Sequence, residues 1–380
     1  MAERALLVLE DGTWFEGQAY GAAGQTLGEL VFNSSMAGYQ EALTDPASHG
    51  QIVVMTAPHI GNTGLNDQDA ESRQIWVSGY VVRSPARRWS NWQGQRSLAD
   101  DLAAQGVVGI AEVDTRAVTL RLRESGTLRA GIFSGPALVD QRGRVRDATE
   151  LVDVVLSWQP EAELSLADAA TTAAPYVVEA TGQPLATVVV VDLGMTASTL
   201  SLLAGRGLTV QVVPADTSFE DIVALEPDGV FFSSGPGDPA ATAEVDLLRA
   251  VLSAGLPFFG VGLGHQLLGR ALGFDTYRLH HGHHGLGMPV RDLATDRILI
   301  TTHNHDFAVR LETGQEVMAP YADGRFGRVR VSHLSLNDDV VEGLECLDRP
   351  ASSVQFQPES ATGPREGAYL LDRFAALLTQ

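Results

Sequence analysis

The chain has 380 residues and a mass of 40.5 kDa, which is long enough for two or three domains that each bury a core. Its 47 acidic residues outnumber its 26 basic ones, and the net charge of −21 argues against binding to nucleic acid or to an anionic membrane. The single cysteine, Cys346, excludes an intramolecular disulfide and a cysteine-rich metal site, and no uncharged apolar stretch reaches the ~20 residues of a membrane span, so we expect a soluble cytoplasmic protein.

Residues 1 to about 150 are predicted to form an α+β domain. Short apolar runs typical of strands alternate there with glycine-rich turns and two helical stretches. The predicted strands are Ala5 to Leu9, Gln51 to Thr56, Trp76 to Val82 and Val107 to Ile110, and the predicted helices are Leu98 to Gln105 and Thr115 to Ser125.

Residues 151–185 are predicted to link this domain to a second one. From about residue 160 the chain is rich in alanine, threonine, proline and glutamate and has no sustained periodicity.

Residues 186–380 are predicted to form an α/β domain with a parallel sheet. Continuous β-branched and apolar runs alternate with helical segments, which is typical of a parallel sheet buried on both faces. Such sheets place their functional sites at the carboxyl ends of the strands. The alternating segments are Thr187 to Val191, Thr199 to Ala204, Leu208 to Val213, Gly229 to Phe232, Leu247 to Ala254 and Pro257 to Gly260.

The segment from Phe258 to Leu268 has the pattern of a nucleophile elbow, a buried strand that turns sharply into a helix. The central residue of such a turn points its side chain into the active-site crevice, and small residues two positions before and after it permit close packing. Gly260, Gly262 and Gly264 occupy these three places. The elbow is therefore predicted without a nucleophilic side chain.

This elbow resembles the Gly-Ile-Cys-Leu-Gly-His-Gln segment of class I glutamine amidotransferases, and the whole chain resembles the small subunit of carbamoyl-phosphate synthase. The narrower resemblance is carried by seven strings in the amino-terminal half: Phe32-Asn33, Gly38-Tyr39-Gln40-Glu41, Leu43-Thr44-Asp45-Pro46, Gly50-Gln51-Ile52-Val53, Gly61-Asn62, Ser90-Asn91-Trp92 and Val113-Asp114-Thr115-Arg116. It covers nearly the full length, and it implies that residues 186–380 form a class I glutamine amidotransferase domain with a flavodoxin-like mixed/parallel sheet.

The resemblance implies a subunit that hydrolyses glutamine and passes ammonia to a large synthetase subunit. That family makes carbamoyl phosphate from bicarbonate, ammonia and two ATP. ATP and Mg²⁺ are then expected on the partner, the large subunit or a paralogue of it, and no cofactor is expected on this chain.

The catalytic triad that the resemblance implies is incomplete. Gly262 occupies the position of the family's cysteine and Gln357 that of its histidine, whereas Glu359 retains the orienting glutamate. Neither glycine nor a carboxamide can attack an amide carbon or carry a proton near neutral pH. Glutamine hydrolysis by the family mechanism is therefore predicted to be lost. The chain is expected to keep a structural or docking role.

The substrate pocket that the resemblance implies is only partly retained. Asp306 replaces a pocket glycine, and Ala47 replaces a serine of the amino-terminal domain. Thr196 and Ser198 also depart from the family's usual residues, and we assign this pair no role. The matching positions are Gly235, Gly237, Leu263, Gln266, Asn304 and Phe307. The backbone N–H of Leu263 is the expected oxyanion-hole donor.

Histidines cluster at two places, His280 to His284 and His303 to His305. Closely spaced histidines can bind zinc or copper. The resemblance already accounts for His283, His284 and His305, so only His280, His281 and His303 are unexpected. We predict ordinary pocket lining and no metal, with a new metal site formed with Asp306 as the alternative.

Three other functions are also compatible with the sequence. The chain could be a non-enzymatic regulatory or interaction protein, an enzyme that uses a metal at His303, His305 and Asp306, or a subunit that hydrolyses glutamine by an unrecognised route. Cys346 lies in a strand-like run and is interpreted as a small buried hydrophobic residue rather than a nucleophile.

Overall fold

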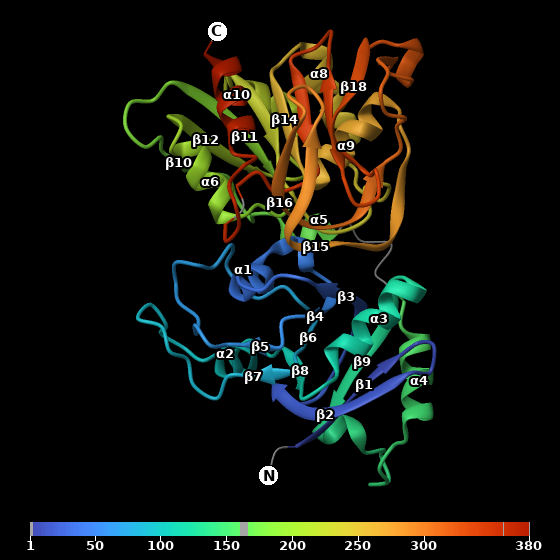
Figure 1. Cartoon of the computed structure of the whole chain (residues 1–380). Coiled ribbons are helices and arrows are strands. Elements are labelled where there is room, and N and C mark those ends of the chain that lie inside the picture. Colours follow the sequence, from blue (N-terminus) through green and yellow to red (C-terminus); the bar gives the residue numbers. More distant parts are fainter. Residues whose placement is uncertain (1–2, 160–165, 360, 380) are drawn as a thin grey trace. The chain divides into compact units, whose positions relative to one another are not determined.

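The computed structural model describes residues 3–159, 166–359 and 361–379 (Figure 1). The described residues divide into two compact units: residues 3–159 together with 280–284, and residues 166–279 together with 285–359 and 361–379. No helix within these ranges is both long enough and apolar enough to span a membrane.

The first unit is built on a closed barrel of seven strands in the order β1-β2-β8-β6-β4-β3-β9, with both parallel and antiparallel neighbours. These strands are β1 (Arg4–Leu9), β2 (Trp14–Gly21), β3 (Gln25–Asn33), β4 (Gln51–Met55), β6 (Gly79–Val81), β8 (Val108–Ala111) and β9 (Leu128–Ser134). Strand β4 is buried along its whole length, because apolar clusters form on both sides of it. The predicted α+β class therefore takes the form of a barrel with helices packed around it.

Four helices, two 3₁₀ turns and a small parallel sheet complete the first unit. They are α1 (Tyr39–Thr44), α2 (Leu98–Ala104), α3 (Thr115–Ser125), α4 (Ala148–Ser157), η1 (Pro46–Ser48), η2 (Gly135–Leu138), β5 (His59–Ile60) and β7 (Ser84–Pro85). Helices α2, α3 and α4 begin where the side chains of Ser97, Asp114 and Asp147 accept a hydrogen bond from a first-turn N–H.

The second unit contains an eleven-stranded sheet in the order β10-β12-β11-β13-β14-β20-β19-β16-β15-β18-β17. Its parallel part, which confirms the predicted fold, is β12 (Leu208–Pro214), β11 (Ala186–Asp192), β13 (Gly229–Phe232), β14 (Phe258–Val261) and β20 (Ala351–Val354). The remaining strands are β10 (Tyr176–Val178), β19 (Val341–Cys346), β16 (Arg297–Val309), β15 (Thr276–Asp292), β18 (Arg328–Ser335) and β17 (Val317–Met318).

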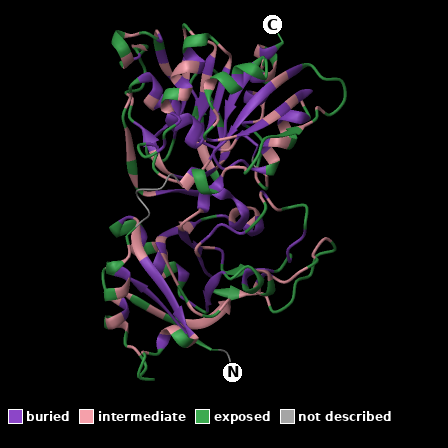
Figure 2. Cartoon of the chain, turned by 180° about the vertical axis from the view of Figure 1, so that it is seen from behind, coloured by how far each residue is buried: buried purple, intermediate pink, exposed green. Residues whose placement is uncertain are grey.

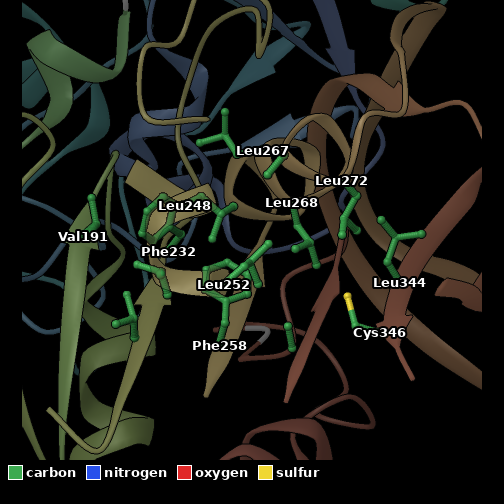
Figure 3. Packing of buried hydrophobic residues seen from close by; sticks show 14 of the residues in the cluster. Val191, Phe232, Leu248, Leu252, Phe258, Leu267, Leu268, Leu272, Leu344 and Cys346 are labelled. Carbon is green, nitrogen blue, oxygen red and sulfur yellow. The ribbon is translucent and has the colours of Figure 1, made fainter. Parts of the chain in front are cut away.

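Both faces of the parallel part are buried (Figure 2). Along β11, Val189 and Val191 belong to one apolar cluster, and Val188 and Val190 belong to another. Figure 3 shows the first cluster, in which Leu248 and Leu267 of two helices pack near Phe232. The helices and the 3₁₀ turn of this unit are α5 (Leu166–Ala170), α6 (Ala197–Ala204), α7 (Phe219–Ala224), α8 (Val245–Ala254), α9 (Leu263–Leu272), α10 (Tyr369–Leu378) and η3 (Tyr321–Asp323).

The segment predicted as a linker, 151–185, carries regular structure. Most of α4 and all of α5 lie in it, and β10 pairs antiparallel with β12 at the edge of the large sheet. The capping box of Asp147 and Glu150 is the local signal for α4. Residues 160–165 lie outside the described residues.

Candidate functional site

The predicted elbow is present between β14 and α9. Gly262 joins them with φ +57° and ψ −111°, a backbone conformation that strains residues with a Cβ. Its N–H donates to the carbonyl oxygen of Val354 on β20 at 3.0 Å, and its own carbonyl oxygen accepts from the N–H groups of His265 and Gln266, each at 3.1 Å. These bonds anchor the turn at the carboxyl ends of two neighbouring strands.

The flanking glycines are required by close packing. A Cβ at Gly260 would lie 2.6 Å from the carbonyl oxygen of Gly264, and a Cβ at Gly264 would lie 2.4 Å from the carbonyl oxygen of Phe232. Both distances are well inside van der Waals contact. The small residues of the elbow pattern therefore allow α9 to start directly against the sheet.

Gly262 itself has more room. A Cβ there would lie 3.1 Å from Cβ of Ser234 and 3.9 Å from the carbonyl oxygen of Gln355. A side chain at this position would need Ser234 to shift by only a few tenths of an ångström, in addition to the strain of the positive φ. The turn therefore keeps the geometry of a nucleophile elbow, although its central residue has no side chain.

The glycine turn after β13 adjoins the elbow. A Cβ at Gly235 would lie 2.1 Å from the carbonyl oxygen of Leu193, and Gly237 has φ +100°. The hydroxyl of Ser233 accepts from the N–H of Leu193 at 2.9 Å and donates to the carbonyl oxygen of Ser234 at 2.7 Å. The hydroxyl of Ser234 donates to the carbonyl oxygen of Gly194 at 3.5 Å. The hydroxyl groups of both serines therefore stabilise the loop by hydrogen bonds to its backbone.

The remaining predicted pocket residues of the second unit come from α9 and β16. Gln266 is buried, and its amide NH₂ donates to the carbonyl oxygen of Phe307 at 2.9 Å and to Oε1 of Gln355 at 3.1 Å. Because successive side chains of a strand point to opposite faces, Asn304 and Asp306 share one face of β16. Leu263 is the first residue of α9, where a helix leaves its N–H groups without an intrahelical acceptor.

The predicted pocket position in the first unit is Ala47, which lies in η1. It is buried there, and its N–H donates to the side chain of Asp45 at 3.0 Å.

Gln357 and Glu359, the positions that the family resemblance assigns to the triad histidine and glutamate, follow β20. The backbone N–H of Gln357 donates to the carbonyl oxygen of Thr302 on β16 at 2.9 Å, and its side chain is half-buried. Glu359 is buried, and its Oε1 accepts a hydrogen bond from the hydroxyl of Thr196 at 3.1 Å. The Thr196 hydroxyl lies 2.8 Å from that of Thr199. Thr196, for which the sequence predicts no role, thus binds Glu359, the position that the family resemblance assigns to the triad glutamate.

Replacing Thr196 with valine is expected to destabilise the fold by about 1–3 kcal/mol, because a buried carboxylate would lose a hydrogen-bond donor. Urea unfolding of the variant measures this change. Thr209→Val makes the same chemical change on β12, away from the carboxylate, and serves as the control. Equal stabilities of the two variants would show that the bond to Glu359 contributes nothing.

Cys346 is a core residue, as predicted. It lies on β19, and Figure 3 shows its sulfur near Leu344 and Leu272. Burial raises the pKa of the thiol to about 12, so it is protonated at neutral pH and cannot act as a nucleophile.

The two histidine clusters belong to different units. His280 to His284 group with the first unit, where the ring of His281 lies 5.5 Å from that of Phe32 and Nε2 of His280 lies 3.4 Å from the carbonyl oxygen of Glu124. His303 and His305 lie on β16 of the second unit.

Comparisons with known proteins agree with this architecture. The carbamoyl-phosphate synthase small chain, CPSase domain, matches residues 7–132, and the class-I glutamine amidotransferase domain matches residues 189–377. The carbamoyl phosphate synthase small chain of Bifidobacterium longum is 52% identical over 381 residues, covering 98% of this chain and 94% of that protein. The small chain of Streptomyces coelicolor is 54% identical over 378 residues, with 98% and 96% covered. The small chain of Mycobacterium tuberculosis is 49% identical over 381 residues, with 99% and 98% covered.

Identity at this level extends through both matched domains and over nearly the whole length of each relative. The elbow, the glycine turn and Glu359 lie within the second matched domain. This chain therefore belongs to the carbamoyl phosphate synthase small chain family.

Proposed function

We propose that this chain is a carbamoyl-phosphate synthase small subunit that has lost glutamine hydrolysis and retains a docking role for a synthetase large subunit. The observation that carries the proposal is the elbow at Gly262, which keeps its strained backbone without any nucleophilic atom. The position of the base is occupied by Gln357, whose carboxamide does not titrate.

Among the described residues, Ser234 and Cys346 do not substitute for this chemistry. A serine attacks a carbonyl only when a base takes its proton, and Ser234 instead donates to the carbonyl oxygen of Gly194. Cys346 is buried in the core with its pKa raised to about 12. In a comparable hydrolase triad, loss of the nucleophile or the base lowers kcat on the order of a million-fold.

Docking of a large subunit is supported by large apolar side chains left in solvent. Trp92 is 90% exposed and Met36 is 77% exposed, and both lie in the first unit. Exposed aromatic side chains are enriched at protein interfaces and provide much of the binding energy there. ATP and Mg²⁺ would be bound by the large subunit. The role left to this chain would be to support a synthetase that uses free ammonia.

The proposal predicts that ammonium, but not glutamine, supports carbamoyl phosphate synthesis. The complex of this chain with the large subunit encoded in the same genome should respond to ammonium as the nitrogen donor. With glutamine, synthesis should not rise above the level that trace ammonia supports. The measurement is carbamoyl phosphate formed, together with glutamate released from labelled glutamine, with and without this chain.

The ammonium reaction serves as the internal control, because it shows that the synthetase is active. Release of glutamate at ordinary amidotransferase rates would overturn the loss of hydrolysis. A chain that does not co-purify with the large subunit and leaves its ammonium reaction unchanged would contradict the docking role, and would favour a separate regulatory function.

A further inference from the structure

Three metal-ligating side chains meet inside the second unit. His303 and His305 lie two residues apart on β16 and therefore share one face of that strand, and Glu342 comes from the next strand of the sheet, β19. Nδ1 of His303 lies 3.2 Å from Nε2 of His305 and 3.6 Å from Oε2 of Glu342. Nε2 of His305 lies 4.0 Å from Oε1 of Glu342. All three side chains are at least 95% buried.

The hydrogen bonds around His303 fix its tautomer. The hydroxyl of Thr301 lies 2.8 Å from the carbonyl oxygen of Met288 and 2.7 Å from Nε2 of His303. A carbonyl can only accept, so the single hydroxyl proton is donated to Met288. The hydroxyl must then accept the proton of His303 Nε2–H. In the neutral ring this leaves the lone pair on Nδ1, the atom that faces His305 and Glu342.

The tautomer of His305 follows in the same way. Its Nδ1 lies 3.0 Å from the carbonyl oxygen of Phe307 and must donate to it. The lone pair of the neutral ring is therefore on Nε2, which faces His303. Two nitrogen lone pairs and a carboxylate thus converge on one point, an arrangement that attracts a positive charge.

The spacing fits a metal ion. Zinc binds histidine nitrogen at about 2.0–2.1 Å and carboxylate oxygen at about 2.0–2.2 Å, so the donor atoms of a tetrahedral site lie roughly 3.3–3.6 Å apart. The separations of 3.2, 3.6 and 4.0 Å match such a site to within a few tenths of an ångström. The contacts to Thr301 and Phe307 are the supporting bonds that orient metal-ligating histidines.

We propose that Nδ1 of His303, Nε2 of His305 and the carboxylate of Glu342 bind one first-row divalent cation, zinc in the first place, and that this ion ties β16 to β19. The site differs from the alternative raised by the sequence. Asp306 points to the opposite face of β16, and His280 and His281 belong to the first unit. The proposal does not depend on the loss of glutaminase activity.

The test uses the full chain without a polyhistidine tag, produced in zinc-supplemented medium so that the buried site can fill during folding. After gel filtration without chelators, elemental analysis should find about one zinc per chain. Protein produced with cobalt should show the visible absorption of four- or five-coordinate Co²⁺ with histidine ligands. Wild-type protein with less than a tenth of an equivalent of metal in both preparations would overturn the proposal, and a shared proton would then occupy the site.

Substitutions assign the ligands. Glu342→Gln and His303→Gln should each lower the metal content at least ten-fold, and Thr301→Val, which removes only a supporting bond, should weaken affinity about 10–100-fold. His333→Gln is the matched control, because His333 is also buried but bonds to Ser332 and Tyr369. The control should keep its metal. Full retention of metal by folded Glu342→Gln protein would refute the assignment of Glu342 as a ligand. If the variants do not fold, the cobalt spectrum of the wild-type protein decides whether the site binds a metal through histidine.

Discussion

The double variant Gly262→Cys, Gln357→His is expected to hydrolyse glutamine about a thousand-fold faster than the unaltered chain. The two substitutions return the nucleophile and the base to an elbow that already has its strained backbone and an orienting carboxylate, Glu359. The gain should fall short of the roughly million-fold that a complete triad provides, because Asp306 and Ala47 differ from the residues that the family resemblance implies for the pocket.

Local geometry supports this expectation. A Cβ at position 262 meets Ser234 Cβ at 3.1 Å, a contact that a small movement of the loop relieves. The new sulfur would lie at the start of α9, where the helix dipole and the first-turn N–H groups lower the pKa of a thiol. The N–H of Leu263 is in the same turn and would face the oxyanion.

The single variants are the controls, because neither thiol nor imidazole completes the reaction alone. Both should remain near the level of the unaltered chain in a labelled-glutamine assay of the complex with the large subunit. Gly262→Cys alone should nevertheless react with iodoacetamide at pH 7, whereas Cys346, with its pKa raised to about 12, should react only after unfolding. A folded double variant that neither hydrolyses glutamine nor reacts with iodoacetamide would show that the elbow no longer faces a crevice.

Patterns of adjacent residues were sufficient to predict much of this fold. The alternation of β-branched runs and helical stretches placed four of the parallel strands of the second unit to within one or two residues, as for β13, Gly229–Phe232. The fifth, β20 (Ala351–Val354), lies outside this alternation and was not predicted. The three glycines around Gly262 predicted the elbow, because the close approaches at Gly260 and Gly264 are local to one turn.

Features that depend on distant residues could not be predicted. The bond between Thr196 and Glu359 joins positions 163 residues apart, and no periodicity in either segment signals it. Glu342 lies near His303 because β19 and β16 are neighbours in the sheet, and the sequence does not show which strands are neighbours. The metal-site alternative considered from the sequence therefore combined the histidines with Asp306, which is adjacent to His305 in the chain. Helix α4 had a local signal, the capping box at Asp147, which the alanine- and proline-rich composition farther along the chain obscured.

The second large effect is expected at Gly264, where alanine should destabilise the second unit by roughly 3 kcal/mol or more. The added Cβ would lie 2.4 Å from the carbonyl oxygen of Phe232, a backbone atom inside the sheet that cannot move aside as a side chain can. Gly255→Ala is the control. Gly255 ends α8 with φ +74°, and apart from its chain neighbours no described heavy atom lies within 4 Å of the added Cβ, so only backbone strain of about 1 kcal/mol is expected.

Urea unfolding of the two variants separates two reasons for the persistence of the elbow. If Gly264→Ala costs far more than Gly255→Ala, the glycines are needed to pack α9 against β13, and the fold requires this turn whether or not the chain hydrolyses glutamine. If the two variants are equally stable, packing does not require this glycine. The shape of the elbow would then point to a ligand or partner that uses it.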